Sequence, residues 1–270
     1  MAAVCHQERI AMPAAPGQVP LVAWCVLAVA LLAALVFAFD PQRLLTSLGD
    51  TDDATRMLQV RTLLDGASWY DMRLPRYGGA EPLVSHWSRL IDAPIAVLLY
   101  GFELVLPRDQ AELAVRAVWP LLVLLAFVYL MARETQLRGG RRAALLAIAL
   151  TVTCLLGITQ FMPGRVDHHN AMIVCAVIGI LRLARSFDDE AAGWSAGIFL
   201  GLGTAIGYEA LALTTASLSA AVLFGLAPGR SLLAPSRAAV TFAATLSVAL
   251  SITETGDALL VNACDALSLN

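Results

Sequence analysis

Residues 19–39, VPLVAWCVLAVALLAALVFAF, form an apolar run without a charged side chain. An α-helix needs about 20 apolar residues to cross a hydrocarbon core of about 30 Å, so this run is long enough to span a membrane. It is longer than the apolar part of a cleavable signal peptide, and the segment before it carries a single base, Arg9. We therefore expect a retained signal-anchor helix over residues 20–39, with residues 1–19 in the cytoplasm.

The whole chain has the composition of a membrane protein. Of its 270 residues, 59% are hydrophobic and 14% are charged, and the mean hydropathy is +0.72, a balance that a water-soluble domain does not sustain. The formal net charge of −3 offers no basic stripe for phosphates, which excludes nucleic acid as a partner. Six further apolar runs are candidate spans: residues 113–132, 143–161, 171–186, 194–208, 211–227 and 238–253. The sequence thus predicts an all-α fold, a polytopic transmembrane bundle of about seven spans that forms one domain over residues 1–270.

An eighth apolar run, residues 91–106, fits an interfacial or re-entrant helix better than a span. It is short and carries two carboxylates and a proline. If it does not cross, the arginines of residues 133–142, 182–185 and 230–237 all lie on the side of the N-terminus, as the positive-inside rule requires. This orientation predicts a multi-pass protein of a bacterial inner membrane.

The same orientation leaves two loops on the periplasmic side. The first external loop covers residues 40–112 and contains the interfacial helices, and the second covers residues 162–170. A third external turn surrounds Glu209. Short loops between membrane spans that carry ionisable residues are candidates for function.

The first external loop begins with residues 49–56, GDTDDATR, which hold three carboxylates within four residues. Such carboxylates repel one another unless a cation, an arginine or water screens them, and Arg56 supplies only part of that screening. The alternative is a helix start, in which an Asp or Thr caps the helix and further acids interact well with the helix dipole. The spacing leaves both interpretations open.

The second external loop contains residues 164–170, GRVDHHN, between two predicted spans. Asp167, His168 and His169 resemble half of a site for Mn²⁺, Mg²⁺ or Zn²⁺, because carboxylate and imidazole are ligands of these ions. The alternative is a solvated turn in which Asn170 caps the next helix. Since both motifs fall on one face of the membrane, we expect a composite metal site that can bind the pyrophosphate of a lipid carrier.

Together the two loops resemble those of the catalytic subunit of oligosaccharyltransferases, in the multi-span GT-C class of glycosyltransferases. In that family an Asp of the first external loop is followed six residues later by an Arg, as Asp50 is by Arg56. Residues 66–71, GASWYD, also look like part of that loop. Residues 164–169 are similar to the D-x-H form of the motif in the family's second external loop.

The resemblance implies roles for individual residues. Asp50, Asp167 and His169 would be ligands of a divalent cation, Mn²⁺ or Mg²⁺, and Arg56 would hold the loop or a phosphate. The catalytic candidates are the polar residues of the first-loop motif: Asp50, Asp52, Asp53 and Arg56. Four residues near the membrane surface are candidate substrate contacts: His86, Trp87, Arg89 and Glu209. An interfacial anchor is the stronger alternative for Trp87, and a membrane-boundary carboxylate is an equal alternative for Glu209.

The resemblance further implies an enzyme that transfers a sugar from a polyprenyl-phosphate-linked or polyprenyl-diphosphate-linked donor in the membrane to a periplasmic acceptor. The acceptor can be a glycan, a lipid or a protein. Family members continue with more spans, a later external loop and, in true oligosaccharyltransferases, a soluble C-terminal domain, so we expect this chain to be the N-terminal portion of such an enzyme. The alternatives are a polytopic transporter, in which Glu209 couples transport, and a non-catalytic accessory or scaffold protein.

Overall fold

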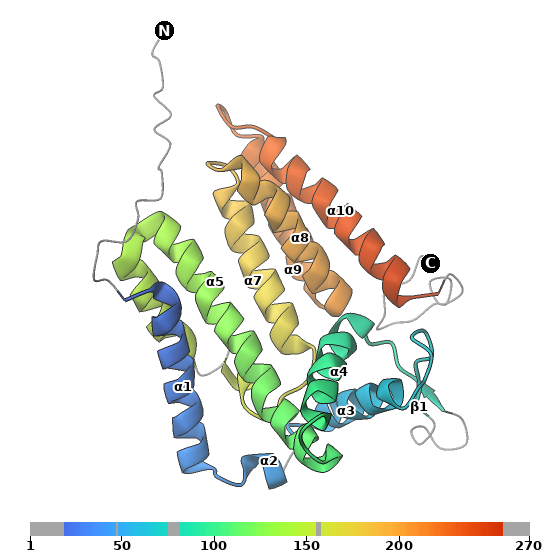
Figure 1. Cartoon of the computed structure of the whole chain (residues 1–270). Helices are drawn as coiled ribbons and strands as arrows, with labels where there is room; N and C mark the ends of the chain where they lie inside the picture. Colours follow the sequence, from blue (N-terminus) through green and yellow to red (C-terminus); the bar gives the residue numbers. More distant parts are fainter. Residues whose placement is uncertain (1–18, 47, 75–81, 155–157, 256–270) are drawn as a thin grey trace.

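The computed structural model describes residues 19–46, 48–74, 82–154 and 158–255, and this part of the chain is almost entirely helical (Figure 1). The predicted all-α fold is thereby confirmed. In chain order the elements are α1 (Leu21–Phe39), α2 (Arg43–Thr46), α3 (Thr51–Leu64), β1 (Arg73–Leu74), β2 (Leu83–Val84), α4 (Arg89–Glu103), α5 (Arg108–Thr153), the 3₁₀ turn η1 (Thr159–Phe161), α7 (His169–Arg185), α8 (Glu190–Ile206), α9 (Ala210–Gly225) and α10 (Leu233–Thr253). The two strands form a short antiparallel pair within the first loop.

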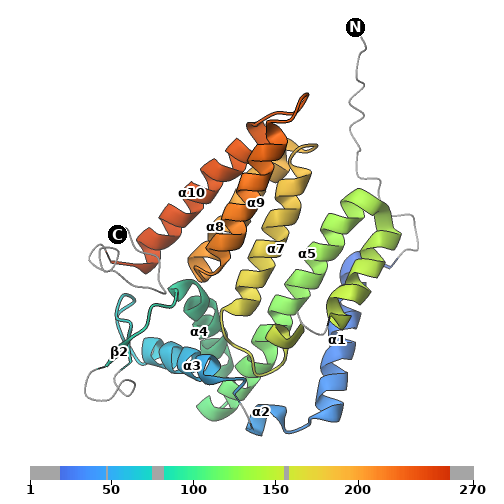
Figure 2. The same ribbon diagram turned by 180° about the vertical axis from the view of Figure 1, so that it is seen from behind.

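The long helices run alternately up and down between two ends of the molecule (Figures 1 and 2). The loop end carries α2, α3, α4, residues 158–168 and residues 207–209. The arginine end carries residues 133–142, 182–190 and 226–237. Helix α5 contributes two antiparallel segments because its backbone turns at Gly140, whose φ of 74° is a conformation that glycine adopts without a steric penalty.

Among the described helices, three are long and apolar enough to cross a membrane: α1, α5 and α10. Helix α9 is a shorter apolar helix. Many large apolar side chains on these helices face outward, among them Leu27 and Leu31 of α1 and Leu223 of α9, which are 57%, 58% and 71% exposed. An apolar exterior of this kind suits a hydrocarbon solvent.

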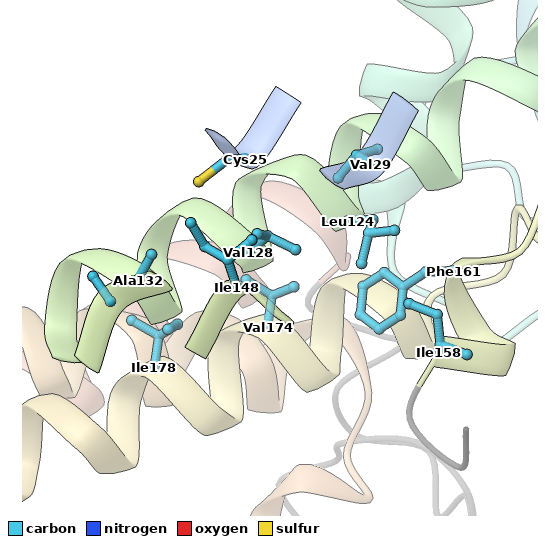
Figure 3. Packing of buried hydrophobic residues seen from close by; sticks show 11 residues of the cluster. Cys25, Val29, Leu124, Val128, Ala132, Ile148, Ile158, Phe161, Val174 and Ile178 are labelled. Atoms are coloured by element: carbon cyan, nitrogen blue, oxygen red, sulfur yellow. The ribbon is translucent and has the colours of Figure 1, made fainter. Parts of the chain in front are cut away.

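The bundle is held together beside α5 by an apolar core (Figure 3). Cys25 and Val29 of α1 point toward Leu124 and Val128 of α5, and Val174 of α7 lies in the same cluster. These three helices are distant in sequence, so their shared core fixes α1 and α7 on the same long helix.

One predicted helix boundary is wrong. The apolar run 143–161 was expected to be helical throughout, whereas the helix ends at Thr153. Ile158 and Phe161 instead belong to the core, and the Phe161 ring stacks on Phe127 at 5.5 Å between ring centroids. Hydropathy cannot detect this ending because buried loop residues are as apolar as helical ones.

Residues 91–106 were expected to form an interfacial or re-entrant helix. They lie within α4 and the turn after it at the loop end, where α4 packs against α3 and α5. Ser88 caps α4 by accepting a hydrogen bond from the Leu90 N–H, at 3.3 Å.

Helices α8 and α10 pack closely because α8 presents glycines at every fourth position. A Cβ added to Gly197 would meet the Ala238 carbonyl oxygen and lie 2.7 Å from the Phe242 nitrogen, and one added to Gly201 would lie 2.9 Å from the Phe242 carbonyl oxygen. The Thr241 hydroxyl donates to the Trp194 carbonyl oxygen at 2.9 Å across this contact. Small residues with a polar crosslink are typical of helix pairs in membranes.

Substituting Gly197→Ala should therefore lower the free energy of unfolding by about 1–3 kcal/mol, because the new methyl group forces α8 and α10 apart. Thermal unfolding of the purified protein in detergent measures the effect. Gly101→Ala is the matched control, since an added Cβ at Gly101 of α4 meets nothing within 4 Å. Equal stability of the two variants would contradict the close packing.

Candidate functional site

The site begins at the first residues of α3, where two of the three clustered carboxylates form a capping box. Asp50 accepts hydrogen bonds from the Asp52 and Asp53 N–H groups at 3.0 and 3.2 Å, and Asp53 accepts one in return from the Asp50 N–H at 3.1 Å. The helix-start interpretation of this motif is therefore realised. Gly49 is required beside it, because a Cβ there would lie 2.6 Å from Cδ of Arg165.

Asp53 also joins the first loop to the second loop. Its Oδ1 accepts hydrogen bonds from the N–H groups of Val166 at 2.7 Å and Asp167 at 2.9 Å, across 113 and 114 residues of sequence. Asp53 is fully buried. A single carboxylate thus satisfies three backbone donors in two loops, and the structure brings together the two motifs that the sequence places on one face.

Arg165 lies between the carboxylates of both loops. Its Nη1 contacts Asp50 and lies 2.9 Å from Asp53 Oδ2, while its Nη2 lies 3.8 Å from Asp167 Oδ2 and donates to Gln160 Oε1 at 2.9 Å. No role was predicted for Arg165 from the sequence. Its only signal was its place within the second motif, directly after Gly164, whose φ is 103°. The guanidinium places a positive charge among these three carboxylates.

The second loop carries a tight Asp-His-His cluster, made of Asp167, His168 and His169. Asp167 Oδ1 lies 2.6 Å from His168 Nδ1, and Asp167 Oδ2 contacts His169 Nδ1. The possible ligand atoms of the three residues lie within 4.8 Å of one another, and the two imidazole rings stack at 4.3 Å between centroids. The donors are of the type that Zn²⁺ and Mn²⁺ accept.

The charges of this cluster follow from its contacts. Burial by itself would raise the pKa of Asp167, but hydrogen bonds from His168 and His169 outweigh burial and hold that pKa far below its usual range. The hydrogen bond to Asp167 in turn raises the pKa of His169. Burial raises the pKa of Asp53 to about 6, against the attraction of Arg165. The cluster therefore presents an anionic carboxylate with two imidazoles beside it.

Two substrate candidates converge on His168. Glu209 Oε1 lies 3.8 Å from His168 Nε2, and the Trp87 ring lies 5.8 Å from the His168 ring. Gly207 permits the approach of the α8–α9 turn, because a Cβ there would lie 2.7 Å from Glu209 Oε2 and 3.0 Å from His168 Cδ2. Trp87 faces the cluster rather than serving only as an interfacial anchor.

Arg56 and Arg89 lie in a buried ion-pair network next to the site. Arg56 Nη1 lies 2.6 Å from Asp92 Oδ1, and Arg89 Nη1 lies 2.9 Å from Asp92 Oδ2. All three side chains are 0–1% exposed. The Arg56 guanidinium also lies 4.7 Å above the Trp87 ring. Arg56 therefore contacts the site through Trp87 and ties α3 to α4.

Arg89 fixes the chain that follows α3. Its Nε donates to the Trp69 carbonyl oxygen at 2.8 Å and its Nη2 to the Asp71 carbonyl oxygen at 2.7 Å. Its contacts are thus structural and lie within residues 66–71. Asp92, which pairs with both arginines, was predicted from the sequence only as a charge that disfavours a membrane span.

The remaining candidate residues, Asp52 and His86, lie at the edge of the site. Asp52 is half-buried in the first turn of α3, where its charge favours the helix start. His86 is exposed, with its ring edge-on to Trp87 at 6.1 Å.

Asn170 does not cap α7 as the alternative interpretation of the second loop supposed. It lies within the first turn of that helix, which begins at His169, and its Oδ1 accepts from the Ala171 N–H at 2.7 Å.

Comparison with known proteins adds no relative to this description. No family model matches the chain, and no curated protein and no solved structure matches it significantly.

The buried ion pairs give a testable consequence for stability. Asp92→Asn should lower the free energy of unfolding by about 3–5 kcal/mol, because it leaves two buried guanidinium groups without their carboxylate. Denaturant-induced unfolding in detergent measures the loss. Asp109→Asn, at an exposed carboxylate of α5, is the control and should change stability little. A loss of similar size in both variants would show that the network contributes nothing specific.

Proposed function

We propose that this chain is the membrane-embedded part of a glycosyltransferase that takes a sugar from a polyprenyl-phosphate-linked or polyprenyl-diphosphate-linked donor and transfers it to a periplasmic acceptor. The observation that carries the proposal is the contact of Asp53 with the backbone of Val166 and Asp167. It places the acidic start of α3 beside the Asp-His-His cluster at the loop end. That pairing is the arrangement that the resemblance to the GT-C class implies.

The cluster residues fit a divalent cation, Mn²⁺ or Mg²⁺, with Asp167 and His169 as ligands and Asp50 as a ligand from the first loop. A bound cation would neutralise charge on the donor phosphate as the sugar leaves. Asp167 suits this role because its pKa is held low, so its carboxylate is ionised at neutral pH. His168 is buried between Asp167 and Glu209 and orients the cluster.

Arg165 links cation binding to donor binding in this proposal. Its guanidinium now pairs with Asp50 and Asp53 and lies near Asp167. A guanidinium binds phosphate oxygens bidentately as well as carboxylates. Arg165 can therefore exchange its carboxylate partners for the phosphate of the donor, and that exchange frees Asp50 and Asp167 for the cation.

The orientation and the span count belong to the same proposal. Seven helical segments would cross the inner membrane: α1, the two segments of α5, α7, α8, α9 and α10. The arginine end, with eight arginines against four carboxylates, would lie in the cytoplasm. The loop end with the site would lie in the periplasm, where α3 and α4 rest on the bundle.

Reporter insertions test this orientation. A periplasm-dependent reporter inserted after residue 106 should be active, because the first loop is external, and the same reporter after residue 138 should be inactive. A cytoplasm-dependent reporter at the same two positions is the control and should give the opposite pattern. Periplasmic activity after residue 138 would overturn the proposed topology.

The enzymatic proposal predicts metal-dependent turnover. The purified chain in detergent, given Mn²⁺ and a polyprenyl-linked sugar, should release the free sugar by hydrolysis, with water taking the place of the acceptor. The double variant Asp167→Ala/His169→Ala should lose more than about 100-fold in both Mn²⁺ affinity and turnover, since changes even to the residues around metal ligands typically cost about 10–100-fold. Calorimetry measures the binding, and release of radiolabelled sugar measures the turnover.

Asp109→Ala is the matched control, because it removes an exposed carboxylate at the loop end outside the cluster. It should bind Mn²⁺ and turn over like the wild type. Unchanged Mn²⁺ binding by the double variant would remove the cluster from the metal site. Metal binding by the wild type without turnover of any lipid-linked donor would instead favour a non-catalytic role.

A further inference from the structure

A cavity of about 420 Å³ lies between α7 and α9, far from the site. The walls come from Ile180, Leu183 and Phe187 on one side and from Ser217, Ala221 and Phe224 on the other. These residues lie toward the C-terminal ends of α7 and α9, with Phe187 just after α7, and both helices run toward the arginine end (Figures 1 and 2). We call this cavity the apolar slot.

The chemistry of the apolar slot suits a hydrocarbon chain. Of the side chains that line it, only Ser217 carries a polar atom, and its hydroxyl donates to the Leu213 carbonyl oxygen at 2.7 Å. An occupant therefore meets almost entirely apolar walls, and the one hydroxyl proton among the lining side chains is already donated within α9. The volume lies within the range of about 300–1,000 Å³ that is usual for ligand sites.

The side chain of Arg230 lies at the rim of the slot. The Arg230 guanidinium lies 4.6 Å above the ring of Phe224, which lines the slot. Among the described residues, no carboxylate forms a salt bridge with Arg230, whereas Arg182 and Arg185 share Glu134 and Arg237 pairs with Glu190. The positive charge of Arg230 is thus not neutralised by any described carboxylate, so Arg230 can pair with an anion.

We propose that the apolar slot binds one hydrocarbon chain of an anionic phospholipid whose phosphate contacts Arg230. Charge complementarity supports this occupant, because the arginine end holds eight arginines against four carboxylates and anionic headgroups are attracted to such surfaces. The slot opens beside the outward apolar side chains of α9, including Leu223, which is 71% exposed. The inference uses the proposed membrane orientation and is independent of the proposed transferase activity.

Lipid binding by native mass spectrometry tests the proposal on the full chain in detergent, with phosphatidylglycerol and phosphatidylcholine of identical chains. The wild type should bind phosphatidylglycerol more tightly. Arg230→Gln should weaken phosphatidylglycerol binding about fivefold, the factor expected for one arginine near a lipid surface, and weaken phosphatidylcholine binding less, because the choline cation of that lipid offsets its phosphate charge. Ala220→Leu, at an exposed alanine that lines the slot, should weaken the binding of both lipids by filling it.

Two matched variants serve as controls. Arg142→Gln removes an exposed arginine of the arginine end on α5, and Ala212→Leu enlarges an exposed alanine of α9 that does not line the slot. Both should bind the two lipids like the wild type, and all four variants should keep the wild-type melting temperature in lipid-free detergent. Equal binding of the two lipids by the wild type, an effect of Arg142→Gln as large as that of Arg230→Gln, or unchanged binding by Ala220→Leu would each overturn the proposal.

Discussion

The arrangement of the loop end depends on the Asp53 carboxylate. It accepts the Asp50 N–H within its own helix start and the N–H groups of Val166 and Asp167 in a loop more than a hundred residues later. Buried backbone donors need partners, and the loss of this one acceptor would leave three of them unsatisfied. The position of α3 relative to the second loop, and hence the distance between the two acidic motifs, follows from this one side chain.

The buried pairing of Asp92 with Arg56 and Arg89 complements that contact. Asp53 fixes one end of α3 to the second loop, and Arg56 fixes the next turn of α3 to α4. Because Arg89 also binds two carbonyl oxygens before β1, the described part of the first loop is anchored by its own side chains. A rigid loop of this kind holds side chains in place above a bundle whose own helices are joined mainly by apolar contacts and small residues.

Much of the fold could be predicted from the sequence, because an uninterrupted apolar run such as residues 21–39 has few structural options, and because Asp92 within α4 is too costly to face lipid. The early end of the second α5 segment could not be predicted, since Phe161 is equally apolar in a helix or in a packed turn. At the site, the clustering of the two motifs was predictable from topology. The partners of Arg165 were not predictable, because the spacing of residues in the sequence does not determine which of several carboxylates a long side chain contacts.

The guanidinium of Arg165 has a consequence for how the site comes together. Three carboxylates at one helix start and one loop would oppose each other during folding, and a counterion built into the chain removes that repulsion before any free ion arrives. The carboxylates of the loop end can therefore be neutralised by Arg165 during folding, without a bound ion. Any cation that binds these carboxylates later must compete with the Arg165 guanidinium, which is covalently attached and therefore has a high effective concentration. This competition favours divalent ions over the abundant monovalent ones.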